Sequence, residues 1–312
     1  MGELTAAAPA PSDSSDDHRA SRDDPDGHGQ LVELADGRVV ASRHWPGEGV
    51  PLVALHGLFD CSLGWKHVAA ATERPCVAFD LPGFGRSAMP AENRFASYAR
   101  DILDALDVLG VGEFSLVGHS LGGAVAAELS ERAADRALNL TLLAPAGFGA
   151  VPLAELLEDN AVGRLLRRGV PLALSNPLSA AGIYMAVVAH GRLPERQLLG
   201  RVMRRAFSAA PGAVAANEAI VAAARDSDGF VHRSVRYAGP AYVLWGASDI
   251  LIPASHADRV CEALPQATLT VWEGMGHHPQ RERPKELNKY LAATTRVQTG
   301  GSRTAGALSA AA

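Results

Sequence analysis

The stretch LVGHSLGGAV, residues Leu116–Val125, places one serine, Ser120, among three glycines. An apolar run precedes Ser120 and a run typical of a helix follows it. Together with Gly118 and Gly122, Ser120 fits the pattern G-x-S-x-G, in which the serine sits on a strained strand-to-helix turn with its hydroxyl held clear of the sheet. Glycines are needed there because a Cβ would collide with the closely packed strand and helix. The amide N–H groups at the start of the helix suit a negative charge developing beside the serine. The stretch therefore predicts a nucleophile, if partner residues exist.

Short apolar runs recur along the chain and alternate with helical patterns. The runs predicted as strands are VPLVALHG (50–57), PCVAFD (75–80), FSLVGH (114–119), LNLTLLA (138–144), PAYVLWG (240–246) and ATLTVWEG (267–274). A turn at Asp36 and Gly37 predicts an antiparallel hairpin before them. Helices are predicted near 254–263, near 284–293 and in 96–110, whose apolar face is Tyr98, Ile102, Leu103, Leu106 and Leu109. This alternation indicates a mostly parallel sheet covered on both faces.

Composition and charge place the chain among ordinary globular proteins, with 312 residues, 47% hydrophobic and 20% charged. The net charge of -5 arises within residues 1–30, which carry seven acidic residues and two arginines, so no basic field indicates nucleic acid. Residues 1–30 are predicted to be a disordered leader that is not a secretory signal, and residues 296–312 a disordered tail. The three cysteines, Cys61, Cys76 and Cys261, share no metal-ligand spacing and are expected to be free thiols in a reducing cytoplasm.

A serine hydroxyl is a weak nucleophile that needs a base, and the base needs a residue that orients it. Loops at the carboxyl ends of the strands of an open α/β sheet converge, so the partners of Ser120 are expected there. The loop after AYVLW offers Asp249, and the loop after LTVW offers His277 and His278.

Five pieces of the sequence carry a resemblance to the α/β-hydrolase superfamily across about residues 31–295. They are LHGL (55–58), DLPGFGRS (80–87), GHSLGG (118–123), WGASDILIP (245–253) and GMGHHPQRERP (274–284). The order serine, aspartate, histidine is also that of the family. The chain resembles its serine-nucleophile, esterase- and lipase-like branch. The resemblance implies an α/β-hydrolase fold: a mostly parallel eight-stranded sheet flanked by helices, with core segments 31–148 and 236–295 and a helical cap at 149–235.

The same resemblance implies the roles of individual residues. Ser120 would be the nucleophile, Asp249 the acid and His277 the base, since the family's G-x-G-H pattern selects the histidine after the second glycine. The backbone N–H groups of Leu58 and Leu121 would form the oxyanion hole. This chemistry requires no metal and no organic cofactor.

Four further features are expected to have supporting roles. His56 is expected to brace its loop through hydrogen bonds, and His119 to pack beside the serine turn. His278 would line the entrance or pack, and the DLPGFGRS loop would be structural.

A serine at this turn selects the chemistry, because relatives that open epoxides or remove halides use aspartate there. The favoured function is cleavage of a carboxylic ester with a fairly apolar acyl part. Carbon–carbon bond hydrolysis and acyl transfer are the alternatives within the fold. A non-catalytic, receptor-like or ligand-binding scaffold is the alternative of another class.

The predicted cap contains an uncharged run of 21 residues, from Gly169 to Ala189. Pro171 and Pro177 argue against one membrane-spanning helix, so the run is interpreted as two apolar cap segments that could line an acyl pocket. Its flanks carry Arg164, Arg167, Arg168, Arg192, Arg196, Arg201, Arg204 and Arg205 against the single acid Glu195. These arginines form either a solvated helix face or a docking site for an anionic partner.

Overall fold

The computed structural model describes residues 26–58, 60–149 and 234–295. The predicted leader up to residue 25, the predicted cap over residues 150–233, with its uncharged run and its arginines, and the predicted tail lie outside these residues.

An eight-stranded sheet forms the centre of the described structure, in the order β1-β2-β4-β3-β5-β6-β7-β8. The strands are β1 (His28–Glu33), β2 (Val39–Trp45), β3 (Leu52–Leu55), β4 (Cys76–Phe79), β5 (Phe114–His119), β6 (Ala137–Leu143), β7 (Ala241–Gly246) and β8 (Ala267–Trp272). β2 is antiparallel to both β1 and β4, and the strands from β4 to β8 are mutually parallel. The predicted strands, the hairpin and the mostly parallel sheet are therefore confirmed.

Strand β1 begins three residues before Leu31, the start predicted from the sequence. β1 starts at His28, which pairs with His44 of β2. The guanidinium of Arg43 donates hydrogen bonds to the main-chain oxygens of Asp26 and Gly27, at 2.6 and 2.7 Å. Pairing with β2 and the two hydrogen bonds from Arg43 thus hold the end of the segment that the sequence predicts to be a disordered leader.

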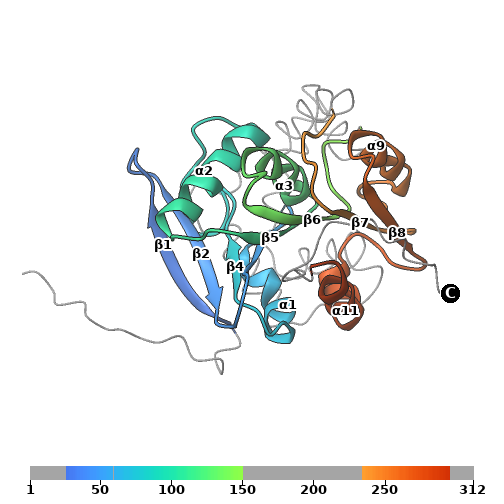
Figure 1. The fold of residues 1–312 in the computed structure, drawn as a ribbon, viewed down its shortest axis with the longest axis horizontal. Helices are drawn as coiled ribbons and strands as arrows, with labels where there is room; N and C mark the ends of the chain where they lie inside the picture. The colour runs from blue at the N-terminus through green and yellow to red at the C-terminus, as the bar shows by residue number, and fades with distance from the viewer. Residues whose placement is uncertain (1–25, 59, 150–233, 296–312) are drawn as a thin grey trace, which may run out of the picture.

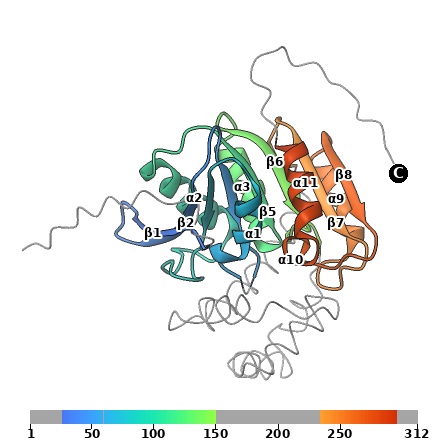
Figure 2. The ribbon, with the colours of Figure 1, turned by 90° about the horizontal axis from the view of Figure 1, so that it is seen from below.

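Helices cover both faces of the sheet (Figure 1). On one face lie α2 (Phe95–Val108), α3 (Leu121–Arg132) and α9 (Ala257–Ala263); on the other lie α1 (Lys66–Ala71) and α11 (Pro284–Thr294), which Figure 2 shows from below. The short helices are η1 (Ser62–Trp65), η3 (Ala254–His256) and α10 (Pro279–Glu282).

Alternate residues of the strands enter two separate hydrophobic clusters. Val53 and Leu116 pack in the cluster that contains residues of α2, α3 and α9. Ala54 and Val117, one position further along, pack in the cluster of α1 and α11. This is the period of two expected for strands with both faces covered.

The predicted apolar face of α2 is directed into the core. Tyr98, Ile102 and Leu106 are almost completely buried, while Leu103 and Leu109 are partly buried at its margin. Among the described residues, none of the helices has the length and apolar character needed to cross a membrane.

Candidate active site

Ser120 occupies the turn between β5 and α3 in a strained backbone conformation. Its φ of 53° and ψ of −120° lie outside the regions favoured by residues with a side chain, at a cost on the order of 1–3 kcal/mol. Main-chain hydrogen bonds hold the turn: the Ser120 N–H donates to the oxygen of Leu143 at 3.0 Å, and its own carbonyl accepts from Gly123 at 2.8 Å and Ala146 at 3.0 Å. Ser120 is 8% exposed.

The glycines beside Ser120 allow the close approach that this turn requires. A Cβ added to Gly118 would lie 2.2 Å from the carbonyl oxygen of Gly122. A Cβ on Gly122 would lie 2.4 Å from the carbonyl oxygens of Leu55 and His56, at the end of β3. The steric reason predicted for the glycines is therefore confirmed.

Asp249 and His277 form a buried pair at the carboxyl ends of β7 and β8. Nδ1 of His277 lies 2.6 Å from Oδ2 of Asp249. The other carboxylate oxygen accepts the N–H groups of Leu251 and Ile252, at 2.9 and 3.0 Å. Because a carboxylate only accepts hydrogen bonds, Nδ1 of His277 is the donor in this contact, and the tautomer of neutral imidazole that fits it has its lone pair on Nε2. This is the tautomer that a general base needs.

The turn that carries Ser120 is bonded to the loop that carries His277. The ring Nε2 of His119 donates to the main-chain oxygen of His277 at 2.8 Å, and the two ring centroids lie 4.8 Å apart. On the other side, a Cβ added to Gly57 would lie 3.0 Å from Cβ of Ser120. The structure thus brings Ser120, Asp249 and His277 to one edge of the sheet, beside the loop that contains Leu58.

The two predicted oxyanion-hole residues belong to segments that adjoin Ser120. Leu121 is the first residue of α3 and follows Ser120 directly. Leu58 follows Gly57, whose close contact with Ser120 places this loop against the serine. The assignment of their N–H groups as oxyanion donors stays a prediction.

His56 braces the loop at the end of β3, as predicted. Its Nδ1 donates to the main-chain oxygen of Gly57 at 2.7 Å, and its Nε2 accepts the N–H of Leu81 at 3.0 Å. Both ring nitrogens are therefore engaged with the main chain, which leaves neither of them for proton transfer.

The DLPGFGRS loop is organised by Asp80. Its carboxylate oxygens accept the main-chain N–H groups of Ser62 at 2.7 Å and Arg86 at 2.9 Å. Gly85 has a φ of +56°, and a Cβ there would lie 2.1 Å from that carboxylate. The loop is thus built as the structural element that the sequence predicts.

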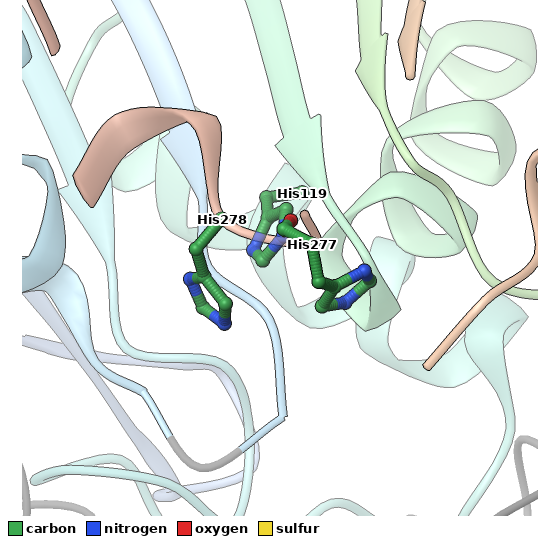
Figure 3. Close-up of side chains that lie close together, drawn as sticks. All are labelled: His119, His277 and His278. Atoms are coloured by element: carbon green, nitrogen blue, oxygen red, sulfur yellow. The ribbon is translucent and has the colours of Figure 1, made fainter. Parts of the chain in front are cut away.

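Three buried histidines, His119, His277 and His278, lie close together, with one nitrogen of each within 4.8 Å of the others (Figure 3). In Figure 3 the three side chains lie side by side, and the ring centroids form a triangle: His119 lies 4.8 Å from His277 and 4.4 Å from His278, and His277 lies 5.4 Å from His278. The amide nitrogen of Gln280 donates to Nδ1 of His119 at 3.0 Å and to Nδ1 of His278 at 3.3 Å. With Nε2 bonded to His277, both ring nitrogens of His119 are occupied.

The charge state of two of these rings, those of His119 and His278, follows from their burial. Burial lowers the pKa of His119 well below its usual value, and the neighbouring His277 lowers it further. Burial and then the neighbouring His119 lower the pKa of His278 in the same way. His119 and His278 therefore fit neutral, hydrogen-bonded supports for the loop that carries His277, and His119, with both ring nitrogens engaged, has no lone pair left for a metal ion.

Glu282 is a site residue that the sequence reasoning missed. Its carboxylate accepts the N–H groups of Gly276 at 2.8 Å and His278 at 2.9 Å, on either side of His277. The signal available was an acidic residue shortly after the histidine in GMGHHPQRERP, but only the tertiary structure shows that it turns back onto that loop.

Residues 50–284 match the family described as the alpha/beta hydrolase fold. The chain belongs to the α/β-hydrolase family.

Relatives within the α/β-hydrolase family include named acyltransferases. The chain is 33% identical over 266 residues to the dihydrolipoyllysine-residue acetyltransferase component of the acetoin cleaving system of Pseudomonas putida, covering 83% of this chain and 67% of that protein. The corresponding component of Cupriavidus necator is 30% identical over 69% of this chain, and the chain spans 54% of that relative's length. The human 1-acylglycerol-3-phosphate O-acyltransferase ABHD5 is 38% identical over 43% of this chain and 40% of its own length.

Solved α/β-hydrolase structures share the fold at lower identity. A thermophilic esterase from Thermogutta terrifontis is 23% identical with a TM-score of 0.65, covering 86% of this chain and 97% of its own. A probable hydrolytic enzyme from Pseudomonas aeruginosa is 20% identical with a TM-score of 0.69, covering 87% and 95%.

Proposed function

We propose that this α/β-hydrolase is a serine hydrolase that cleaves a carboxylic ester with a fairly apolar acyl part. The observation that carries the proposal is the Asp249–His277 pair, because it holds the imidazole as the tautomer of a base at the edge of the sheet where Ser120 lies. A serine at the strained turn supports attack on an acyl carbonyl.

The proposed reaction has two halves. His277 Nε2 takes the proton of Ser120 as Oγ attacks the carbonyl carbon, and the N–H groups of Leu58 and Leu121 bind the resulting oxyanion. The tetrahedral intermediate collapses, and His277 gives the proton to the departing alkoxide. Water then attacks the acyl-enzyme with His277 as base, which releases the acid and restores Ser120. Asp249 stabilises the imidazolium in both halves.

Acyl transfer is the second candidate, and it is favoured by the acyltransferase names of two groups of relatives. The acyl-enzyme would be the same in both reactions, and only the acceptor would differ. An alcohol or thiol would attack the acyl group in place of water. Carbon–carbon bond hydrolysis and a binding role remain the outcomes expected if no ester is turned over.

We place the protein in the cytoplasm. The proposed substrate is a small-molecule ester, and its hydrolysis by the serine mechanism requires no metal and no organic cofactor. Cys61, Cys76 and Cys261 are free, in keeping with a reducing compartment. Docking of an anionic partner on the arginines of the predicted cap rests on the sequence alone.

Hydrolysis of p-nitrophenyl esters of increasing chain length tests the proposal. A pre-steady-state burst that disappears in Ser120→Ala would support an acyl-enzyme, and the preferred chain length would measure the acyl site. Adding alcohols or thiols and analysing the products separates transfer from hydrolysis. The absence of turnover across the series would contradict the ester hydrolase and favour carbon–carbon cleavage or a binding role.

A further inference from the structure

The single-turn helix α10 contacts three loops of the candidate site. It follows His277 and His278 directly, and three of its side chains bond to three different segments. Gln280 bonds to His119, the residue before Ser120, and Glu282 bonds to the main chain on both sides of His277. Arg281 reaches the third loop, which contains Gly57 and Leu58, through Asp60.

Asp60 and Arg281 form a buried ion pair. Nη2 of Arg281 lies 2.7 Å from Oδ1 of Asp60, and the two side chains are 9% and 2% exposed. Because both charges are out of water, the pair loses much of its attraction to desolvation and adds little to net stability. The position of the pair suggests another role. It joins the loop that contains Leu58, called here the oxyanion loop, to helix α10, which follows His277.

The carboxylate of Asp60 is fixed to its own loop. Its Oδ1 accepts the N–H of Cys61 at 2.8 Å, and the Asp60 N–H donates to the oxygen of Gly57 at 3.3 Å. Gly64 closes the other side, because a Cβ there would lie 2.6 Å from the carboxylate. A displacement of Asp60 therefore disturbs its main-chain hydrogen bond to Gly57, the residue before Leu58.

We propose that Asp60 and Arg281 are positioning residues that hold the oxyanion loop in register with His277. This inference rests on the proposed serine hydrolase function. The oxyanion donors stabilise charge that exists only in the transition state, so loss of register acts on kcat while substrate binding is retained. A shift of about 1 Å in such a site costs roughly 100-fold in rate.

The test compares Arg281→Met, Asp60→Asn and the double variant, using p-nitrophenyl ester turnover and thermal unfolding. Arg281→Met leaves a buried carboxylate without its arginine, so kcat is expected to fall about 100-fold with KM nearly unchanged, and Tm by roughly 6–15 °C. In the double variant the unpaired charge is gone, while the asparagine oxygen still accepts from Cys61. Tm is expected to recover, whereas kcat stays low.

The control is the ion pair between Arg38, the residue before β2, and Asp101 of α2, neither of which is among the residues assigned to the site. Nη1 and Nη2 of Arg38 contact the Asp101 carboxylate at 2.5 and 2.8 Å, and the Asp101 side chain is 2% exposed. Arg38→Met is expected to lower Tm while kcat of the folded enzyme stays within about twofold.

A readout that needs no turnover is amide exchange of the peptide that contains Asp60 and Cys61. Exchange is expected to accelerate about tenfold or more in Arg281→Met and in the double variant, and to stay unchanged in Arg38→Met.

Two outcomes would overturn the proposal. If kcat recovers together with Tm in the double variant, the ion pair serves only the stability of the fold. Unchanged exchange would overturn it as well. If the wild-type protein turns over no ester while exchange responds as expected, the ester hydrolase fails and the coupling of the two loops stands.

Discussion

Nδ1 of His277 lies 2.6 Å from the carboxylate of Asp249, although 28 residues separate the two in the sequence. They follow two neighbouring parallel strands, β8 and β7, whose carboxyl ends share one edge of the sheet. Close packing makes this meeting possible, since a Cβ on Gly246 would lie 2.2 Å from the carbonyl oxygen of Gly276. The pair is therefore a consequence of sheet topology as much as of the two side chains.

Replacing Asp249 by asparagine tests the orientation of the base. The amide oxygen can still accept from Leu251 and Ile252, so the fold is expected to survive. The amide nitrogen facing His277 favours the wrong tautomer, and we expect kcat to fall by about 10⁴-fold. Steady-state kinetics with calorimetry would measure both effects. Asp258→Asn, at an exposed position of α9, should change neither. Wild-type turnover in Asp249→Asn would remove Asp249 from the mechanism.

Gly122→Ala tests the close approach of α3 to β3. The added Cβ would meet main-chain oxygens at 2.4 Å, and main chain cannot move aside as a side chain can. We expect a loss of at least about 1–3 kcal/mol in the free energy of unfolding, together with loss of activity. Gly112→Ala is the matched control, because nothing lies within 4 Å of a Cβ there. Equal urea midpoints for the two variants would contradict the steric argument.

Glu282→Gln tests the brace on the base loop. A glutamine has one oxygen for the two N–H groups of Gly276 and His278, so one buried donor loses its acceptor. We expect a loss of about 1–3 kcal/mol in unfolding free energy and a lower kcat through misplacement of His277. Urea unfolding and kinetics would show this, with Glu286→Gln on the exposed side of α11 as the control. A variant with lowered stability but wild-type kcat would confine Glu282 to folding.

Local patterns were sufficient to predict the strands, the hairpin and the serine turn. The period of the apolar residues in α2 and the glycines around Ser120 are signals that neighbouring residues carry by themselves. Asp249 and His277 could be selected because parallel strands bring their carboxyl ends together. Gln280 and Arg281 could not, because their roles depend on which loops α10 approaches, and the sequence around them is that of an ordinary polar helix. The early start of β1 could not be predicted for a similar reason, since pairing with β2 and hydrogen bonds from Arg43 of β2 hold it.

Buried neutral histidines make the stability of the fold depend on pH. Burial, and then the neighbouring His28, lower the pKa of His44 to about 4, and burial lowers the pKa values of His119 and His278 well below their usual value. In the unfolded chain each would titrate near roughly 6.5. Between that value and the folded pKa, the unfolded state binds more protons, so stability rises with pH in this window.

The stabilisation from these histidines is complete above their unfolded pKa and is lost as the pH falls toward their folded pKa values. For His44 the loss is complete near pH 4, and for the other two it continues below their usual range. Each histidine contributes a slope of about 1.4 kcal/mol per pH unit within its window. Urea unfolding between pH 5 and 8 should therefore show a steep decline below about pH 6.5 and little change above pH 7.5.

His44→Gln isolates one of these groups outside the candidate site. Ser42 Oγ lies 2.8 Å from Nε2 of His44, and a glutamine amide can keep this hydrogen bond without titrating. The variant is expected to lower the slope between pH 5 and 6.5 by the equivalent of one proton, with little change in ester turnover at pH 8. A slope equal to that of the wild-type protein would mean that His44 is protonated to the same extent in the folded and unfolded states.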